Sequence, residues 1–588
     1  MRSAVRSAGL TRSGQQGIIC RVTFLFATFR RRLMGVPDWR TTWLVLLALL
    51  ALLTLGRLPL IDEDEGEYGE VAMEMARSGD AFAPTLNAQP FYEKPVLLFW
   101  QQAPLVRLLV PLGAPVEFAL RLPALCASVV WLLALLSFWR ARHGLVLAQH
   151  AVWLAATSLG VVVVARAAAM DALVNALLAL TLFDLWRWLE SGARRPLRRA
   201  AMWAALGMLA KGPVAWVIPG AVLVAYLGFT PPARARLRDL ADPLAWLILL
   251  GVSMPWYGWY AWHSEGAFVT YFFGRENVGR LGGSLQGHSG GYGYYLAVLP
   301  LLLLPYTAVL AWLPPRVRGW WAEPAHRFLL LWFALVFLIF TLAGTKLPHY
   351  LLYGCTPLFL LAAPALAGRL ASVWLALPGV LLPALALALP SIAARMAAHD
   401  HNPYLRELLA RAPLVLDGAW QARVVTWAAA AVLLLVVTIW AALQAPPGDG
   451  PTVRGCAVDG AHAQPAGQAW CLTRLLGWNR EGSRAVLAWA PGLVSALGVS
   501  LVLLPAVTGL QQDPVRRAAR MAASLQQPVV SDDRMPSFSV YLGAATQVRP
   551  VRAGDLAFGR LDHPDRLGTR FDTLFAEGGI RVVRVRAP

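Results

Sequence analysis

Long apolar runs alternate with short polar connections from about residue 42 to residue 510. Runs of this length are typical of helices that cross a bilayer, and the pattern predicts an α-helical polytopic membrane protein with about 13 transmembrane helices. The expected spans are 42–60, 118–139, 145–164, 170–189, 200–210, 212–229, 243–262, 294–314, 326–343, 350–368, 371–391, 422–443 and 485–510. Lys211-Gly212-Pro213 interrupts the stretch 200–229, which fits either two short helices or one kinked helix.

Arginine gathers in the short connections between these runs. The connections that carry it are 140–143, 187–199, 233–238, 316–318, Arg369 and 454–484. Because positively charged loops stay in the cytoplasm, a cytoplasmic N-terminus and thirteen spans place every one of them inside. The loops 61–117, 165–169, 263–293, 344–349 and 392–420 then lie outside, as does the tail. The sequence therefore predicts a basic cytoplasmic arm (1–41), a transmembrane domain (42–510) and an extracytoplasmic domain (511–588).

The two largest outer segments have their own patterns. In the first outer loop, 61–117, residues 66–78 predict an amphipathic helix, and Leu97–Val110 predicts an interfacial helix that lies along the membrane. Tyr68, Val71, Ala72 and Met75 share one face of the first helix, and Glu67, Glu70 and Glu74 share another. The tail predicts a small α/β domain with β-type runs at Pro528–Val530, Ser537–Leu542, Gln547–Val551 and Ile580–Val585.

Composition supports a membrane protein and narrows its partners. The 588 residues are 57% hydrophobic and 14% charged, with a mean hydropathy of +0.53, whereas soluble chains are about 25% charged. The net charge of +19 does not point to nucleic acid, because loop arginines account for it. Lysine occurs only at Lys94, Lys211 and Lys346. Each stands beside Gly or Pro or one residue from Pro, which marks these positions as candidates for a compact ammonium group.

Six acids crowd into nine residues at the end of the first apolar run. They are Asp62, Glu63, Asp64, Glu65, Glu67 and Glu70. A charge run is usually a solvated face. At the exit of a transmembrane helix it also suits a partner such as a cation or a hydroxyl-bearing substrate.

These strings resemble the polyprenyl-phosphate-sugar-dependent glycosyltransferases of the GT-C fold. The likeness is carried, in order, by Asp64-Glu65-Gly66-Glu67-Tyr68-Gly69-Glu70, Ser78-Gly79-Asp80, Phe91-Tyr92-Glu93-Lys94-Pro95, Arg121-Leu122-Pro123, Lys211-Gly212-Pro213, Glu276 to Arg280, and Lys346 to Tyr350. The transferases that attach 4-amino-4-deoxy-L-arabinose to lipid A are the most similar, and protein O-mannosyltransferases are more distant relatives.

The resemblance implies roles for individual residues. Asp64, with Glu65 beside it, would orient or deprotonate the acceptor. Asp171 matches a second family aspartate, although an ion pair with Arg166 would also explain it. Lys211 fits either catalysis or helix capping.

The resemblance also implies a set of groups for the donor phosphate. Lys94, Arg280 and Lys346 would hold its charge, Tyr350 would donate a hydrogen bond, and His349 would contact it. A lipid-headgroup anchor is the alternative for Arg280, and an ordinary interfacial histidine is the alternative for His349.

Glu93 resembles a position that helps to bind a divalent metal ion. The family pairs it with a histidine after a glutamate, but this chain has Glu276-Asn277 there. An ion pair between Glu93 and its neighbours is the alternative.

Together these features predict an inverting glycosyltransferase of the bacterial inner membrane, with its active site facing the periplasm. The expected donor is an undecaprenyl-phosphate-linked sugar, and the expected acceptor is lipid A or another envelope glycan, with membrane lipids around the protein. An enzyme that mannosylates protein hydroxyls is one alternative. A transporter or flippase is another, although the acidic and lysine strings occur once each, whereas transporters often contain internal repeats.

Overall fold

The computed structural model describes residues 39–282, 290–367, 377–443, 480–531, 535–563, 567 and 570–586. The chain forms two compact units, residues 1–49 and residues 50–588. Most of the predicted basic arm (1–41) and of the arginine-bearing segment 454–484 lies outside the described residues. Everything below concerns the second unit unless α2, which runs across the boundary, is named.

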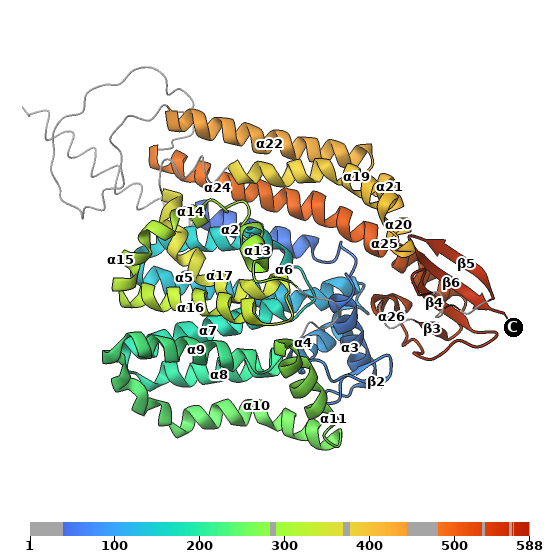
Figure 1. Cartoon of the computed structure of the whole chain (residues 1–588), viewed down its shortest axis with the longest axis horizontal. Helices are drawn as coiled ribbons and strands as arrows, with labels where there is room; N and C mark the ends of the chain where they lie inside the picture. Colours follow the sequence, from blue (N-terminus) through green and yellow to red (C-terminus); the bar gives the residue numbers. More distant parts are fainter. Residues whose placement is uncertain are drawn as a thin grey trace, which may run out of the picture. The chain divides into compact units, whose positions relative to one another are not determined.

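Helices dominate the chain (Figure 1). The α-helices are α2 (Trp39–Thr54), α3 (Asp64–Ser78), α4 (Leu97–Leu109), α5 (Val116–Thr157), α6 (Leu159–Val164), α7 (Asp171–Ser191), α8 (Arg194–Lys211), α9 (Val214–Phe229), α10 (Pro243–His263), α11 (Ala267–Val269), α12 (Gly279–Gly282), α13 (Tyr294–Leu302), α14 (Val309–Trp312), α15 (Val317–Ala322), α16 (Pro324–Leu342), α17 (Leu352–Ala362), α19 (Leu381–His399), α20 (Pro403–Ala410), α21 (Ala412–Val415), α22 (Gly418–Leu443), α24 (Arg480–Gly498), α25 (Leu504–Ser524) and α26 (Ser537–Leu542). The 3₁₀-helical segments are η1 (Pro231–Ala241), η3 (Pro314–Arg316), η4 (Pro348–Leu351), η5 (Ala363–Ala367) and η6 (Leu377–Val380), and the π-helical segments are η2 (Thr270–Val278) and η7 (Val499–Leu503).

The apolar helices confirm a multi-pass membrane protein. Within the described ranges, seven helices are long and apolar enough to span a bilayer, or up to eight if the bent pair η1–α10 is one span. Arg40–Thr54 and Val214–Phe229 are shorter apolar helices. The count of thirteen spans stays a prediction, because several expected runs are broken, as between α13 and α14.

The Lys211-Gly212-Pro213 string separates two helices rather than kinking one. Gly212 follows α8 with a φ of +89°, a conformation that L side chains rarely adopt. A Cβ there would also come within 2.5 Å of the Phe272 ring. Pro213 then precedes α9, so Lys211 is left at the very end of α8.

Both helices predicted in the first outer loop are present, as α3 and α4. The predicted apolar face of α3 is buried, namely Tyr68, Val71, Ala72 and Met75. Acids on the other face are not all solvated. Glu70 is fully buried and pairs with Arg77 at 3.0 Å, and Glu74 accepts hydrogen bonds from Thr85 and the Ala88 amide. The loop is therefore a packed structure, in which β1 (Thr85–Leu86) pairs with β2 (Gln89–Pro90).

The C-terminal segment forms the predicted α/β domain, but two of the four expected strands are wrong. Its sheet has the order β3-β4-β6-β5, from β3 (Val529–Ser531), β4 (Leu556–Arg560), β5 (Phe571–Glu577) and β6 (Ile580–Val585). Ser537–Leu542 is the helix α26, which starts after Pro536 and ends at Gly543 in the left-handed conformation. Of Gln547–Val551, only Gln547 makes a bridge, to Val530. Helix α26 packs against α3, so this domain lies beside the first outer loop (Figure 1).

Candidate active site

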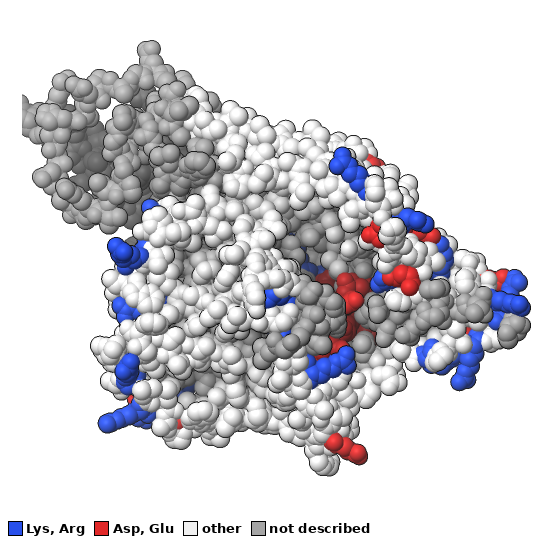
Figure 2. Space-filling view, viewed as in Figure 1, with Lys and Arg blue, Asp and Glu red and all other residues white. Residues whose placement is uncertain are grey.

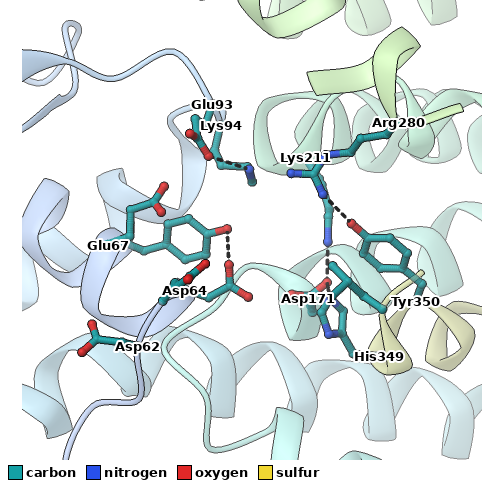
Figure 3. A pocket seen from close by; sticks show the side chains of 13 residues that line it. Asp62, Asp64, Glu67, Glu93, Lys94, Asp171, Lys211, Arg280, His349 and Tyr350 are labelled. Atoms are coloured by element: carbon teal, nitrogen blue, oxygen red, sulfur yellow. Dashed lines mark hydrogen bonds and ion pairs between the residues drawn. The ribbon is translucent and has the colours of Figure 1, made fainter. Parts of the chain in front are cut away.

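A cavity of about 340 Å³ opens where the first outer loop meets the ends of the membrane helices. Its lining residues are Asp62, Glu63, Asp64, Glu67, Tyr68, Glu93, Lys94, Asp171, Lys211, Arg280, Leu347, His349 and Tyr350. Figure 2 shows acidic atoms in a hollow next to the C-terminal domain, with basic atoms beside them. In Figure 3 the carboxylates of Asp62, Asp64 and Glu67 lie on one side, and Lys211, Arg280 and Tyr350 lie on the other.

Helix α3 presents Asp64 to the cavity. Asp64 is the first residue of α3, and its carboxylate is exposed and accepts a hydrogen bond of 3.1 Å from the Tyr68 hydroxyl, one turn further on. A helix N-terminus favours a negative charge. An exposed carboxylate with a single hydrogen-bond donor keeps acceptor capacity for a substrate hydroxyl.

Lys94 and Arg280 converge on one carboxylate. Glu276 accepts from Arg280 at 2.7 and 3.1 Å, and Lys94 lies 3.5 Å from the same oxygen and 3.7 Å from Glu93. Arg280 also donates to the Tyr350 hydroxyl at 3.2 Å. Burial lowers the pKa of Lys94, but the surrounding carboxylates outweigh burial and raise that pKa above its ordinary value. Both cations therefore stay charged and are held in place at the cavity wall.

A second cluster surrounds Asp171 at the start of α7. Lys211 donates to its carboxylate at 2.5 Å, the Tyr353 hydroxyl donates at 2.5 Å, and His349 Nε2 lies 3.3 Å away. The ammonium of Lys211 also lies 4.7 Å from the centre of the Tyr350 ring. The structure thus favours a site role for Asp171 and Lys211. The alternative pairing with Arg166 is wrong, because Arg166 donates to the Val162 carbonyl instead.

Glu65 does not line the cavity, which corrects the expectation that it acts beside Asp64. It is only 5% exposed. Its carboxylate accepts from Arg121 at 2.7 and 2.8 Å, from the Ile61 amide at 2.9 Å and from the Ala168 amide at 2.5 Å. All four contacts are internal, so Glu65 joins the loop to the helical bundle.

Lys346 does not line the cavity either, and the expectation that it holds the phosphate is corrected. Its ammonium donates to the carbonyls of Thr341 and Ala343 at 2.8 and 2.7 Å, with Phe340 O at 3.5 Å. These carbonyls belong to the end of α16, where a helix lacks amide partners and favours a cation. Lys346 is therefore a helix cap in this structure.

The expected site did not include several residues that line or support the cavity. The sequence did mark three of them as candidates: Asp62 and Glu67 belong to the acidic run, and Lys211 belongs to one of the three lysine strings. Burial and the charge of Glu93 raise the pKa of Glu67 to about 8. Tyr353 had no signal beyond its position three residues after Tyr350, which puts both on one helical face.

The described residues do not form a metal site around Glu93. Among them, no three His, Cys, Asp or Glu side chains lie close enough to hold an ion. Glu93 accepts from the Tyr271 hydroxyl at 3.2 Å, and the Asn277 amide donates to Phe272 O. His288 lies outside the described residues. The divalent metal stays a prediction, and no catalytic step is assigned to it.

The arginine-rich connection 187–199 lies at the far end of α7 and α8 from the cavity. Helix α7 begins at Asp171 in the cavity and ends at Ser191, and α8 returns from Arg194 to Lys211 in the cavity. Segment 187–199 is therefore one helix length away from the site. The acidic first outer loop and this arginine-rich connection therefore lie at opposite ends of α7 and α8, as expected if the arginine-rich connection is cytoplasmic and the cavity is on the other side of the membrane.

Comparison with known proteins identifies the family. Residues 93–259 match the family model described as dolichyl-phosphate-mannose-protein mannosyltransferase. The undecaprenyl phosphate-alpha-4-amino-4-deoxy-L-arabinose arabinosyl transferase of Pseudomonas paraeruginosa is 31% identical over 415 residues, which is 65% of this chain and 70% of that protein. The chain belongs to this arabinosyl transferase family. It is a glycosyltransferase, as the sequence predicted.

Further relatives of the arabinosyl transferase family agree in sequence and fold. The enzyme of Pectobacterium carotovorum is 34% identical over 56% of this chain and 59% of its own length. ArnT from Cupriavidus metallidurans, solved with undecaprenyl phosphate bound, superposes with a TM-score of 0.72 over 93% of this chain and 97% of its own, at 18% identity. Its apo structure gives 0.69. These superpositions confirm the predicted GT-C fold.

Proposed function

We propose that this chain transfers a sugar, of the 4-amino-4-deoxy-L-arabinose type, from undecaprenyl phosphate to a lipid A-like acceptor. The single observation that carries the proposal is the cavity that Asp64 lines together with the cations Lys94, Lys211 and Arg280. The names of the family's members support the donor. The site would face the periplasm from the inner membrane, since it lies at the opposite end of α7 and α8 from the arginine-rich connection 187–199.

The two sides of the cavity suit the two partners of such a transfer. As the glycosidic bond to phosphate breaks, negative charge grows on the leaving polyprenyl phosphate. Fixed cations and the Tyr350 hydroxyl stabilise that charge without having to reorganise. Asp64 is placed to accept the proton of an acceptor hydroxyl, or to orient an acceptor that is already ionised. Approach from the face opposite the phosphate would invert the anomeric carbon.

The test is turnover by the purified protein in lipid, with labelled undecaprenyl-phosphate sugars as donors. Lipid A, membrane extract and hydroxyl-bearing peptides are offered separately as acceptors. We expect label in lipid A, lost in Asp64→Asn and in Lys94→Ala. Label in peptide would favour the protein mannosyltransferase alternative, which the family match at 93–259 suggests. Absence of transfer to every acceptor by folded protein, with flux of the donor across vesicles, would favour a transporter.

A further inference from the structure

Asp64 lies between two acids whose carboxylates are fixed by distant parts of the chain. Glu65 is bound inside the helical bundle by Arg121 and two amides. Asp62 is bound by the C-terminal domain. By contrast, among the described residues only Tyr68, on the same helix, donates a hydrogen bond to the carboxylate of Asp64. The position of Asp64 at the cavity therefore depends on Asp62, two residues before it, and on Glu65, directly after it.

Ser537 and Gln512 supply the contacts to Asp62. The Ser537 amide donates to Asp62 Oδ1 at 2.9 Å, and Gln512 Nε2 donates to Oδ2 at 3.2 Å. The Ser537 hydroxyl contacts both Asp62 Oδ2 and Gln512 Oε1. Ser537 and Gln512 are 0% and 3% exposed. Breaking a buried hydrogen bond is costly, because it leaves the remaining partner unsatisfied.

The backbone at Gly66 is built for this contact. A Cβ on Gly66 would come within 2.5 Å of the Ser537 amide nitrogen and 3.0 Å of its Cα. Because backbone atoms cannot rotate away as a side chain can, the two segments meet this closely only with glycine at position 66. Nearby, the Leu60 amide donates to the Tyr541 hydroxyl at 2.6 Å. Helix α26 thus contacts residues 60–66 at several positions.

We propose that Ser537 and Gln512 are positioning residues of the transferase site, which hold Asp62 and thereby fix Asp64 at the cavity. This inference rests on the proposed function. The C-terminal domain would then contribute to the geometry of the active site, although Ser537 is 475 residues from Asp62 in sequence. The core of that domain is formed by its own sheet, by α25 and by Met535 and Phe538, and it includes neither Asp62 nor Ser537. Loss of the Ser537 hydroxyl should therefore disturb the loop more than the domain.

The experiment is a double-mutant cycle of Ser537→Ala and Asp62→Ala, with Ser524→Ala as the matched control. Ser524 is an exposed serine of α25 in the same domain, and its hydroxyl bonds to Met521 O. We expect Ser537→Ala to lower kcat ten- to a hundredfold, because small misplacements of a catalytic group have losses of this size. KM for the polyprenyl donor should stay within twofold, since the cations across the cavity hold the phosphate. The double variant should lose no more than Asp62→Ala alone.

Wild-type kcat in Ser537→Ala, or losses that multiply in the double variant, would overturn the proposal. So would a loss confined to KM. Hydrogen exchange of residues 61–67 is measured in parallel, and faster exchange is expected in Ser537→Ala but not in Ser524→Ala. If the wild-type protein transfers no sugar, the proposed function fails. Unchanged hydrogen exchange of residues 61–67 in Ser537→Ala would separately refute the role of the contact between Ser537 and Asp62. If Ser537→Ala does not fold, Gln512→Ala takes its place, because it removes one donor to Asp62 and leaves both contacts between Ser537 and Asp62.

Discussion

Glu65→Gln and Asp64→Asn exchange neighbouring carboxylates for amides of the same shape, and we expect opposite consequences. Glu65 accepts four hydrogen bonds in a buried setting. An amide in its place offers one oxygen and turns an NH₂ group toward N–H donors, so Arg121 loses its counter-charge. Arg121 is 1% exposed, and breaking a buried ion pair in this way costs about 3–5 kcal/mol. Asp64 is exposed, so its replacement should change stability by less than about 0.5 kcal/mol.

The assay measures thermal unfolding in lipid together with turnover per folded molecule. We expect Glu65→Gln to unfold at a clearly lower temperature, and Asp64→Asn to unfold with wild-type protein while losing transfer. Arg121→Met should match Glu65→Gln in stability, because both leave one buried partner unpaired. A Glu65→Gln protein as stable as wild type would refute the assignment of Glu65 as an anchor, and a stable but inactive one would return Glu65 to the catalytic set.

Three further outcomes follow from the same geometry. Arg280→Lys keeps the charge but loses the paired contacts to Glu276 and the bond to Tyr350, so binding of undecaprenyl phosphate, measured by titration, should weaken about tenfold. Lys346→Met should lower the unfolding temperature and leave that binding within twofold, because its bonds go to the end of α16. Burial raises the pKa of Glu67 from 4.5 to about 8, so the folded state retains a proton that the unfolded state releases. Wild-type stability should therefore fall between about pH 4.5 and pH 8, and less steeply in Glu67→Gln, as followed by chemical denaturation.

Periodicity predicted the helices of the first outer loop because both faces of α3 carry a regular signal, and the apolar face is indeed buried. It could not count the spans. Proline and glycine interrupt several apolar runs, and only tertiary packing decides whether the pieces cross the bilayer together. The prediction of a strand at Ser537–Leu542 was wrong because polar and apolar residues alternate over its first four positions, which is the period of a strand. Pro536 and Gly543 are typical residues at the ends of a strand, but they stand equally well at the two ends of a short helix.

For the active site, the sequence motifs identified most of the residues that line the cavity. They could not show which other side chains each of these residues contacts. Asp64, Lys94, Asp171, Arg280, His349 and Tyr350 meet at the cavity as the resemblance implied. Lys346 belongs to the same string as His349 and Tyr350, yet its side chain turns back to the carbonyls of α16. Adjacent residues on a tight turn point in different directions, so a motif places its members near one another without making all of them line the cavity.

The acidic run that ends the first apolar segment therefore performs several tasks, and the fold separates them by partner. Carboxylates this close cannot all be ionised side by side without compensation. Glu65 is compensated by Arg121, and Asp62 is bound by the C-terminal domain with its pKa raised to about 7 by burial. Glu67, with a pKa of about 8, retains its proton at neutral pH. These arrangements lower the negative charge around the cavity where a phosphate must enter. They leave Asp64, exposed at the cavity, with room for an acceptor.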